Sequence, residues 1–304
     1  MDRASRGNKV SREGLADLVK DWQEGFVTVD GIEAHYLEAG SGDPLLLIHG
    51  GLAVSCAELN YGPVMAPLSK HFRVIALDVV GFGETTAPGP DYFPASAQGD
   101  FIIAFLETLD IRPHVGGNSH GGWLSQYVAH QAPERVEKLI IINSLNGTHP
   151  IPPAPEGLKY IVGPQGYHPH RKPTAEGIRA DLQRFYVDQR IVTEARVQRS
   201  LEIATRNYSY AKARAEARHS SIDDFNEDLS YRGKHISEYA GELNRDVLLT
   251  WSRENRGTTP AEAISYLNRL KRGEMHVFLD AGHHVMVEHP QRWSEVVVDF
   301  LRAS

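Results

Sequence analysis

Residues 117–121 read Gly-Asn-Ser-His-Gly, and this stretch decides the fold. An apolar approach ending at Val115-Gly116 precedes it, and the segment Trp123–His130 that follows has helical spacing. The pattern is a G-x-S-x-G turn, in which glycines allow a strained backbone that exposes the serine oxygen at the start of a helix. We therefore predict that Ser119 is a nucleophile, with a phosphate-binding loop and simple packing as the alternatives.

A serine nucleophile of this type needs backbone amides that stabilise the negatively charged oxygen of the reaction intermediate. Upstream, residues 48–51 read Ile-His-Gly-Gly and directly follow an apolar run. One donor should come from this loop and the other from the residue after the nucleophile. We therefore predict that the amides of Gly51 and His120 form the oxyanion hole.

The expected base is a histidine near the C-terminus, after the serine and the acid in chain order. Residues 278–283 read Phe-Leu-Asp-Ala-Gly-His, so His283 follows an apolar run and a glycine. Its Nε2 could accept the Ser119 proton and return it to the leaving group. His284 and His289 remain as alternatives.

The acid position is unusual. After an apolar run, residues 252–256 read Ser-Arg-Glu-Asn-Arg, and Asn255 occupies the place where a triad aspartate is expected. An asparagine carbonyl can orient a histidine, but it brings no negative charge, and neutralising the acid in a serine protease lowers turnover about 10⁴-fold. We expect Asn255 to be the partner of His283, with Glu254 and Asp280 as alternatives.

Short apolar runs alternate with helical patterns along most of the chain. This alternation predicts the α/β class, with a doubly wound and mostly parallel sheet whose sites form at the carboxyl ends of the strands. The runs are residues 44–48, 73–77, 114–115, 139–142 and 247–251, after a predicted β-hairpin at 26–37 and a short amphipathic helix at 15–22.

The alternation stops between about residues 142 and 241. A proline-rich connector at 150–155 leads into helical, polar sequence without strand runs, which indicates an inserted helical lid. The predicted organisation is an N-terminal helical extension (1–25), a first core part (26–144), the lid (145–240) and a second core part (241–304).

Composition excludes several function classes. The formal charge of −7, with no cluster of Lys and Arg, argues against nucleic-acid binding. No apolar run is long enough to span a bilayer or to form a signal peptide, and the single cysteine, Cys56, cannot form an internal disulfide, so we expect a cytoplasmic protein. We predict a small-molecule substrate, no cofactor and no metal, the pair His168 and His170 being a loop rather than a metal site. A homo-oligomer is left open.

Taken together, these motifs resemble the α/β-hydrolase family, and more narrowly the hydrolases that cleave carbon-carbon bonds in meta-cleavage products of aromatic degradation. The resemblance covers nearly all of residues 26–301. It is carried by Leu47–Gly51, His71–Glu84, Gly117–Gly122, Tyr186–Glu194 and Asp280–His283.

The resemblance implies a lid arginine that binds a substrate carboxylate and an aromatic residue after the triad histidine. Here the arginine position holds Ser200 beside Arg199, and the aromatic position holds His284. Substrate recognition has therefore changed. We expect Arg199, Phe185, Tyr186 and His284 to contact the substrate.

Three functions fit these residues. The first is a serine-histidine hydrolase of a carbonyl compound, either a C–C bond beside a ketone or an ester or lactone, in which Ser119 is the nucleophile or an oxyanion-supporting hydroxyl. The second is a cofactor-free lyase, oxygenase or cyclase with His283 as the base. The third is a binding protein that keeps the pocket but has lost the chemistry, and Asn255 favours both alternatives.

Overall fold

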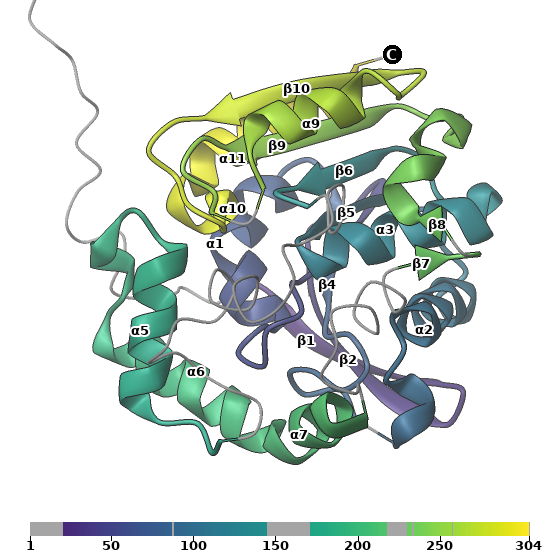
Figure 1. The fold of residues 1–304 in the computed structure, drawn as a ribbon. Helices are drawn as coiled ribbons and strands as arrows, with labels where there is room; N and C mark the ends of the chain where they lie inside the picture. Colours follow the sequence, from purple (N-terminus) through teal and green to yellow (C-terminus); the bar gives the residue numbers. More distant parts are fainter. Residues whose placement is uncertain are drawn as a thin grey trace, which may run out of the picture.

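The computed structural model describes residues 21–86, 88–144, 171–217, 230–232, 234–256 and 258–303. Its centre is an eight-stranded sheet in the order β1-β2-β4-β3-β5-β6-β9-β10 (Figure 1). The antiparallel pairs are β1 with β2 and β2 with β4, and all other neighbours are parallel. The predicted α/β class is confirmed. The strands are β1 Gln23–Val29, β2 Ile32–Ala39, β3 Pro44–Ile48, β4 Arg73–Leu77, β5 His114–Asn118, β6 Leu139–Ile142, β9 Val247–Ser252 and β10 Gly273–Phe278.

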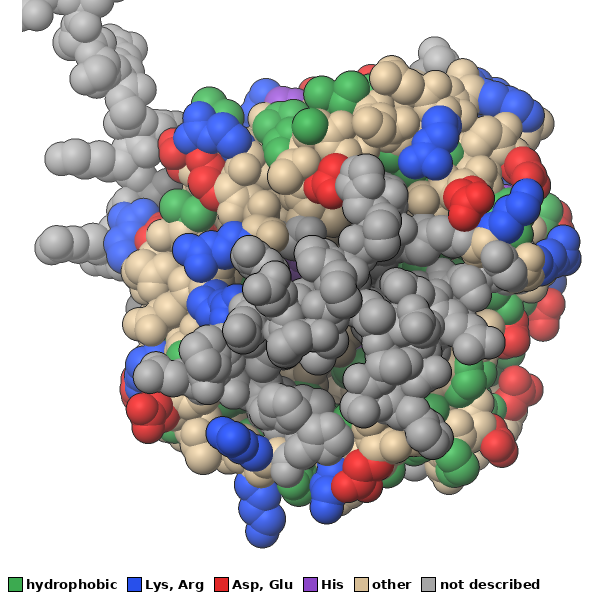
Figure 2. Space-filling model, in the orientation of Figure 1, with side chains coloured by type: hydrophobic (Ala, Val, Ile, Leu, Met, Phe, Trp, Pro, Cys, Tyr) green, Lys and Arg blue, Asp and Glu red, His purple; other side chains and the backbone are tan. Residues whose placement is uncertain are grey.

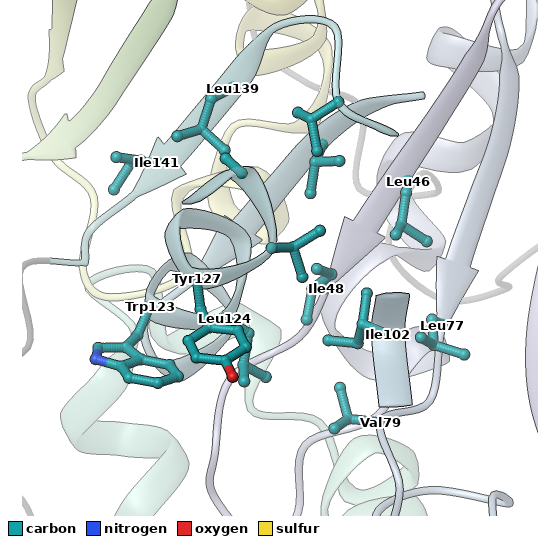
Figure 3. Close-up of a cluster of buried hydrophobic side chains, with 14 of the residues drawn as sticks. Leu46, Ile48, Leu77, Val79, Ile102, Trp123, Leu124, Tyr127, Leu139 and Ile141 are labelled. Atoms are coloured by element: carbon teal, nitrogen blue, oxygen red, sulfur yellow. The ribbon is translucent and has the colours of Figure 1, made fainter. Parts of the chain in front are cut away.

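The central strands are buried on both faces, because alternate side chains enter two different hydrophobic clusters. In β3, Leu46 and Ile48 join one cluster, whereas Leu45 and Leu47 join the other. Figure 3 shows part of the first cluster, which contains Leu46 and Ile48 together with Trp123. That face is covered by α2 Ala95–Thr108, α3 His120–Gln131 and α9 Pro260–Leu267, and the opposite face by α1 Ala57–Ser69, α10 Val285–Glu288 and α11 Pro290–Arg302.

The predicted lid region contains three described helices, which run along one side of the sheet in Figure 1. They are α5 Ala175–Phe185, α6 Glu194–Arg206 and α7 Tyr208–Ala217, with the short helix η3 Gln189–Ile191 between the first two. Buried residues of α5 and α6, such as Leu182 and Val197, join the second cluster. Through these residues α5 and α6 join the cluster that also contains residues of α1 and α11.

One expectation for the lid was wrong, since it contains a short hairpin of β7 Ser230–Tyr231 and β8 Lys234–His235. Two-residue strands are too short to produce an alternating pattern in sequence. The remaining short helices are η1 Pro90–Tyr92, η2 Pro133–Arg135 and η4 Ile236–Glu242.

Some predictions fall where the structure gives no description. The helix predicted at 15–22 lies almost wholly outside the described residues, as do the connector at 150–155 and the pair His168 and His170. Within the described ranges, no helix is both long enough and apolar enough to cross a membrane. Acidic and basic side chains are interspersed over the described surface visible in Figure 2, so no basic patch stands out on that face.

Candidate active site

Ser119 lies on a strained turn between β5 and α3. Its backbone has φ 55° and ψ −119°, in the region that disfavours side chains. The flanking glycines are required by packing: a Cβ at Gly117 would overlap the Gly121 carbonyl, and a Cβ at Gly121 would overlap the Ile48 carbonyl. The structure therefore holds the Ser119 side chain in a partly exposed position at the start of a helix.

The Ile48–Gly51 loop lies against this turn. An idealised Cβ on Gly50 would be 3.6 Å from the Ser119 Cβ, and one on Gly51 would be 2.9 Å from the His120 Cβ. The two predicted oxyanion donors, Gly51 and His120, are therefore neighbours beside Ser119. An oxyanion hole needs both donor residues close to the serine, and this packing brings them there.

His49 fixes the orientation of that loop. Its Nε2 accepts the Val79 amide proton at 3.0 Å, so the ring proton resides on Nδ1, which donates to the Gly50 carbonyl at 2.7 Å. Burial lowers the pKa of His49, which keeps the ring neutral for this role. Because the two ends of a trans peptide point in opposite directions, pinning the Gly50 carbonyl turns the Gly51 amide away from His49.

Asp78 connects three segments next to this loop, a role that the sequence motifs did not assign. Its two carboxylate oxygens accept from the amides of Ala57 at 2.6 Å and Glu84 at 2.9 Å, and from His35 Nδ1 at 2.7 Å. These bonds tie the start of α1 to the end of β4. The sequence feature that could have indicated this role is the position of Asp78 directly after the apolar run at 73–77.

His283 is paired with Asn255. The His283 Nδ1 lies 2.9 Å from the Asn255 Oδ1. The amide orientation follows from its other end, where Nδ2 donates to the Thr258 carbonyl at 2.9 Å and to its hydroxyl at 3.0 Å. Since Oδ1 can only accept, His283 carries its proton on Nδ1 and leaves the Nε2 lone pair free.

The alternative residues for these roles lie elsewhere. Glu254 pairs with Arg253 and accepts from the Ala281 amide at 3.3 Å, and Asp280 is 82% exposed. His289 bonds through Nε2 to the Asp280 carbonyl at 3.1 Å. Of the three side chains considered as partners of His283, the structure brings only Asn255 to it.

The electrostatics of His283 are those of a buried histidine whose partner, Asn255, is neutral. Burial lowers its pKa to about 4, and among the described residues no carboxylate opposes this shift. In an ordinary triad the aspartate would stabilise the imidazolium. His283 is therefore neutral at physiological pH and becomes protonated only in acid.

Two buried asparagines bring His283 to the serine turn. Asn118, the residue before Ser119, donates to the His283 carbonyl at 3.2 Å, and Asn143, the residue after β6, donates to it at 3.1 Å. Asn143 also accepts from the Ser252 amide at 2.8 Å, which links the end of β9. Neither role was predicted; the positive φ of 45° at Asn143 is a structural sign that this position is specialised.

Glu288 connects the histidine loop to the lid. One carboxylate oxygen accepts the Gly282 amide at 2.5 Å, and the other accepts the amides of Val187 at 2.7 Å and Asp188 at 3.0 Å. Burial raises the pKa of Glu288, although these amides favour its charged form. Sequence reasoning missed this contact because its partners are about a hundred residues away in the chain.

The predicted substrate-binding residues divide into two groups. The Phe185 ring centroid is 5.5 Å from that of His283 and 5.8 Å from that of His284, and the Tyr186 ring is 5.4 Å from His284. Arg199 forms ion pairs with three carboxylates. These are Glu58 at 2.7 Å, Glu84 at 3.6 Å and Glu202 at 2.9 Å.

Two other chemistries have little support. Burial raises the pKa of the Cys56 thiol far above its usual value, so this side chain is not a thiolate nucleophile. Across the described residues, no group of three or more His, Cys, Asp or Glu side chains is placed to hold a metal ion.

Comparisons with known proteins support the fold. A family model described as the alpha/beta hydrolase fold matches residues 43–168. With the sheet order and the serine turn, this match shows that the chain has the alpha/beta hydrolase fold.

Over most of its length, the chain is similar to several meta-cleavage product hydrolases. It is 27% identical to the 2-hydroxy-6-oxo-6-phenylhexa-2,4-dienoate hydrolase of Comamonas testosteroni, covering 98% of this chain and 96% of that protein. It is 26% identical to the 2-hydroxy-6-oxononadienedioate/2-hydroxy-6-oxononatrienedioate hydrolase of Paraburkholderia xenovorans, over 89% and 91%. The solved meta-cleavage product hydrolase of Pseudomonas fluorescens superposes with a TM-score of 0.79 at 25% identity, covering 91% and 97%.

Proposed function

We propose that this enzyme hydrolyses a carbonyl compound, at a C–C bond beside a ketone or at an ester or lactone, with Ser119 and His283 as the catalytic pair. The observation that carries the proposal is the fixed His283 tautomer, which leaves a bare Nε2 in a loop tied to the residue before Ser119. A bare Nε2 is what a general base requires.

In the proposed reaction, His283 accepts the Ser119 hydroxyl proton as the oxygen attacks the carbonyl carbon. The Gly51 and His120 amides stabilise the resulting oxyanion. His283 then protonates the departing carbon or oxygen, and water hydrolyses the acyl-enzyme by the same route. Asn255 orients the ring throughout but adds no charge, so the imidazolium is stabilised less than in an aspartate triad.

A specific observation favours a second candidate, a cofactor-free lyase, oxygenase or cyclase. A histidine with a pKa near 4 and a neutral partner is a weak base. Such a base suits the removal of an acidic substrate proton without formation of a covalent intermediate. Ser119 would then support an oxyanion instead of attacking.

Product analysis in ¹⁸O-labelled water separates the candidates. The enzyme should be offered vinylogous 1,5-diketones, aryl esters and lactones, and the products examined by mass spectrometry. Hydrolysis predicts one ¹⁸O atom in the carboxylic acid product and none after Ser119→Ala. Turnover without label would support the second candidate, and absence of turnover on every class would favour a binding protein.

A further inference from the structure

The imidazole of His120, the residue after Ser119, is held by a buried glutamine on α2. The His120 Nε2 lies 2.7 Å from the Gln98 Oε1. Gln98 is fully buried, and His120 is only 9% exposed. Because buried polar groups need hydrogen bonds within the protein, this contact fixes the place of both side chains.

The direction of this hydrogen bond follows from the other end of the glutamine amide. The Gln98 Nε2 donates to the Tyr92 carbonyl at 3.3 Å, and a carbonyl can only accept. The Gln98 Oε1 therefore faces His120, whose Nε2 carries a proton and donates it. The neutral His120 ring is thus the Nε2–H tautomer, the opposite of His283, which carries its proton on Nδ1.

The His120 ring also contacts the loop that supplies the other predicted oxyanion donor. An idealised Cβ on Gly51 would lie 3.1 Å from the His120 Cγ and 3.3 Å from its Cδ2. On the α3 side, the Trp123 ring is nearly parallel to that of His120, at 8° with the centroids 6.4 Å apart. Movement of the His120 ring would therefore disturb both predicted donors, the amide of its own residue and that of Gly51.

Close packing of α2 on α3 brings Gln98 to this place. Gly99 permits the approach, because a Cβ there would overlap the Tyr127 ring. The Tyr127 hydroxyl donates to Asp100 Oδ1 at 2.8 Å, which bonds the same two helices one residue further along. The rings of Trp123 and Tyr127 are stacked with centroids 5.3 Å apart, and both are labelled in Figure 3. The position of Gln98 is therefore set by the packing of two helices.

The carbonyl that orients Gln98 also binds a helix of the predicted lid. The Tyr210 hydroxyl, on α7, donates to the Tyr92 carbonyl at 2.7 Å. Beside it, Arg214 Nε donates to the Phe93 carbonyl at 2.8 Å, and the Phe93 and Tyr210 rings are 5.1 Å apart. A continuous series of hydrogen bonds therefore connects α7, through Tyr92 and Gln98, to the residue that follows the nucleophile.

We propose that Gln98 is a positioning residue of the oxyanion hole. It acts through the His120 imidazole, whose fixed place keeps the His120 and Gly51 amides directed at the oxyanion. Fixed donors stabilise an oxyanion better than mobile ones, because they need no reorganisation when the charge forms. This inference rests on the proposed function for the role of the two amides, whereas the fixed tautomer of His120 requires no reaction at Ser119.

Fluorophosphonate inactivation of the full-length protein measures this role. Ser119 displaces fluoride from phosphorus while a phosphoryl oxygen occupies the oxyanion hole. Gln98→Met is similar in length but can neither accept from His120 nor donate to Tyr92. We expect it to lower the maximal inactivation rate about tenfold, less than the roughly 10²- to 10³-fold loss on removing a donor, and to leave the half-saturating probe concentration unchanged. Gln98→Glu restores an acceptor for His120 and should react faster than Gln98→Met.

His120→Phe tests the same hydrogen bond from its other side and covers the case in which Gln98→Met fails to fold. Phenylalanine keeps a ring and the backbone amide, but it cannot donate to Gln98. We expect a similar loss of rate. The double variant should lose no more than either single variant, because both changes break one bond.

The connection to the predicted lid has its own pair of variants. Tyr210→Phe removes the hydroxyl that donates to the Tyr92 carbonyl, and we expect a smaller loss of rate than in Gln98→Met. Tyr127→Phe is the matched control, because it makes the same change at a hydroxyl that bonds to Asp100, and it should leave the rate unchanged.

Long-range ¹H–¹⁵N NMR of the histidine rings separates this inference from the proposed function. We expect His120 to be the Nε2–H tautomer in the wild type and to lose this fixed state in Gln98→Met. An unreactive Ser119 in the wild type would count against the proposed function, and the tautomer would then decide whether Gln98 holds the ring. Wild-type inactivation rates in both Gln98→Met and His120→Phe, or a His120 tautomer that is the same in wild type and Gln98→Met, would overturn the proposal.

Discussion

Replacing Asn255 with aspartate should convert the weak base His283 into a stronger one. The Asn255 Oδ1 lies 2.9 Å from the His283 Nδ1, so a carboxylate there would place its charge about 4 Å from the imidazolium. At an effective dielectric constant of about 20 this attraction is about 4 kcal/mol, or roughly three pKa units. We therefore expect the pKa of His283 to rise from about 4 to at most about 7.

Two effects oppose this rise, so three pKa units is an upper bound for His283. Asn255 is only 6% exposed, so the new carboxylate would be partly desolvated. Its second oxygen would also face the Thr258 carbonyl, which now accepts from the Asn255 amide at 2.9 Å, although the Thr258 hydroxyl could still donate to it.

The assay is an NMR titration of the His283 ring protons, assigned with a His283→Gln variant and accompanied by turnover of an aryl ester at pH 7. Asn255→Ala is the control, because it removes the hydrogen bond without adding charge. We expect ester turnover to rise at least about tenfold in Asn255→Asp, since a charged partner stabilises the imidazolium that forms in the transition state. A pKa shift of less than about one unit, or an equal shift in Asn255→Ala, would refute the reasoning.

Three further predictions test the surroundings of the site. Activity of the wild type should rise as pH increases through about 4 and then stay level to neutrality, because a lowered pKa leaves His283 deprotonated above that value; a limb near 6.5 in the kcat profile would contradict this. Glu288→Gln should destabilise the protein by about 1–3 kcal/mol and lower kcat, measured by denaturant unfolding and steady-state kinetics, because glutamine offers one acceptor oxygen where three amides now bond to two. Gly282→Ala should lower the melting temperature by several degrees, because its Cβ would overlap the Phe185 carbonyl, whereas Gly241→Ala, with its nearest atom at 3.5 Å, should change it little.

The fold was predictable because its signals are local. Residues 117–121 encode strand, turn and helix within a short span, and the apolar runs of the central strands reflect burial on both faces. The candidate partner of His283 was also visible, since Asn255 follows its strand where an acid is expected. Each of these patterns is formed by residues that are close together in the sequence.

The supports of the site were not predictable in the same way. Glu288 bonds to amides about a hundred residues earlier, and Asn143 bonds to the carbonyl of His283, so both contacts exist only after the chain has folded. On α6, the sequence suggested Arg199 as a substrate contact but gave no role to Arg196. Because Val197 and Ser200 are buried on that helix, Arg196 lies beside the buried face, whereas Arg199 points to the acidic residues at its edge.

The central claim is that Ser119 is a nucleophile activated by His283 despite a neutral partner. The most direct measurement is the rate of fluorophosphonate labelling, followed by mass analysis of the peptide that contains Ser119. We expect a covalent adduct on Ser119 in the wild type, a rate at least about a hundredfold lower in His283→Ala, and no adduct in Ser119→Ala. An unlabelled wild-type protein, or equal labelling of wild type and His283→Ala, would contradict it.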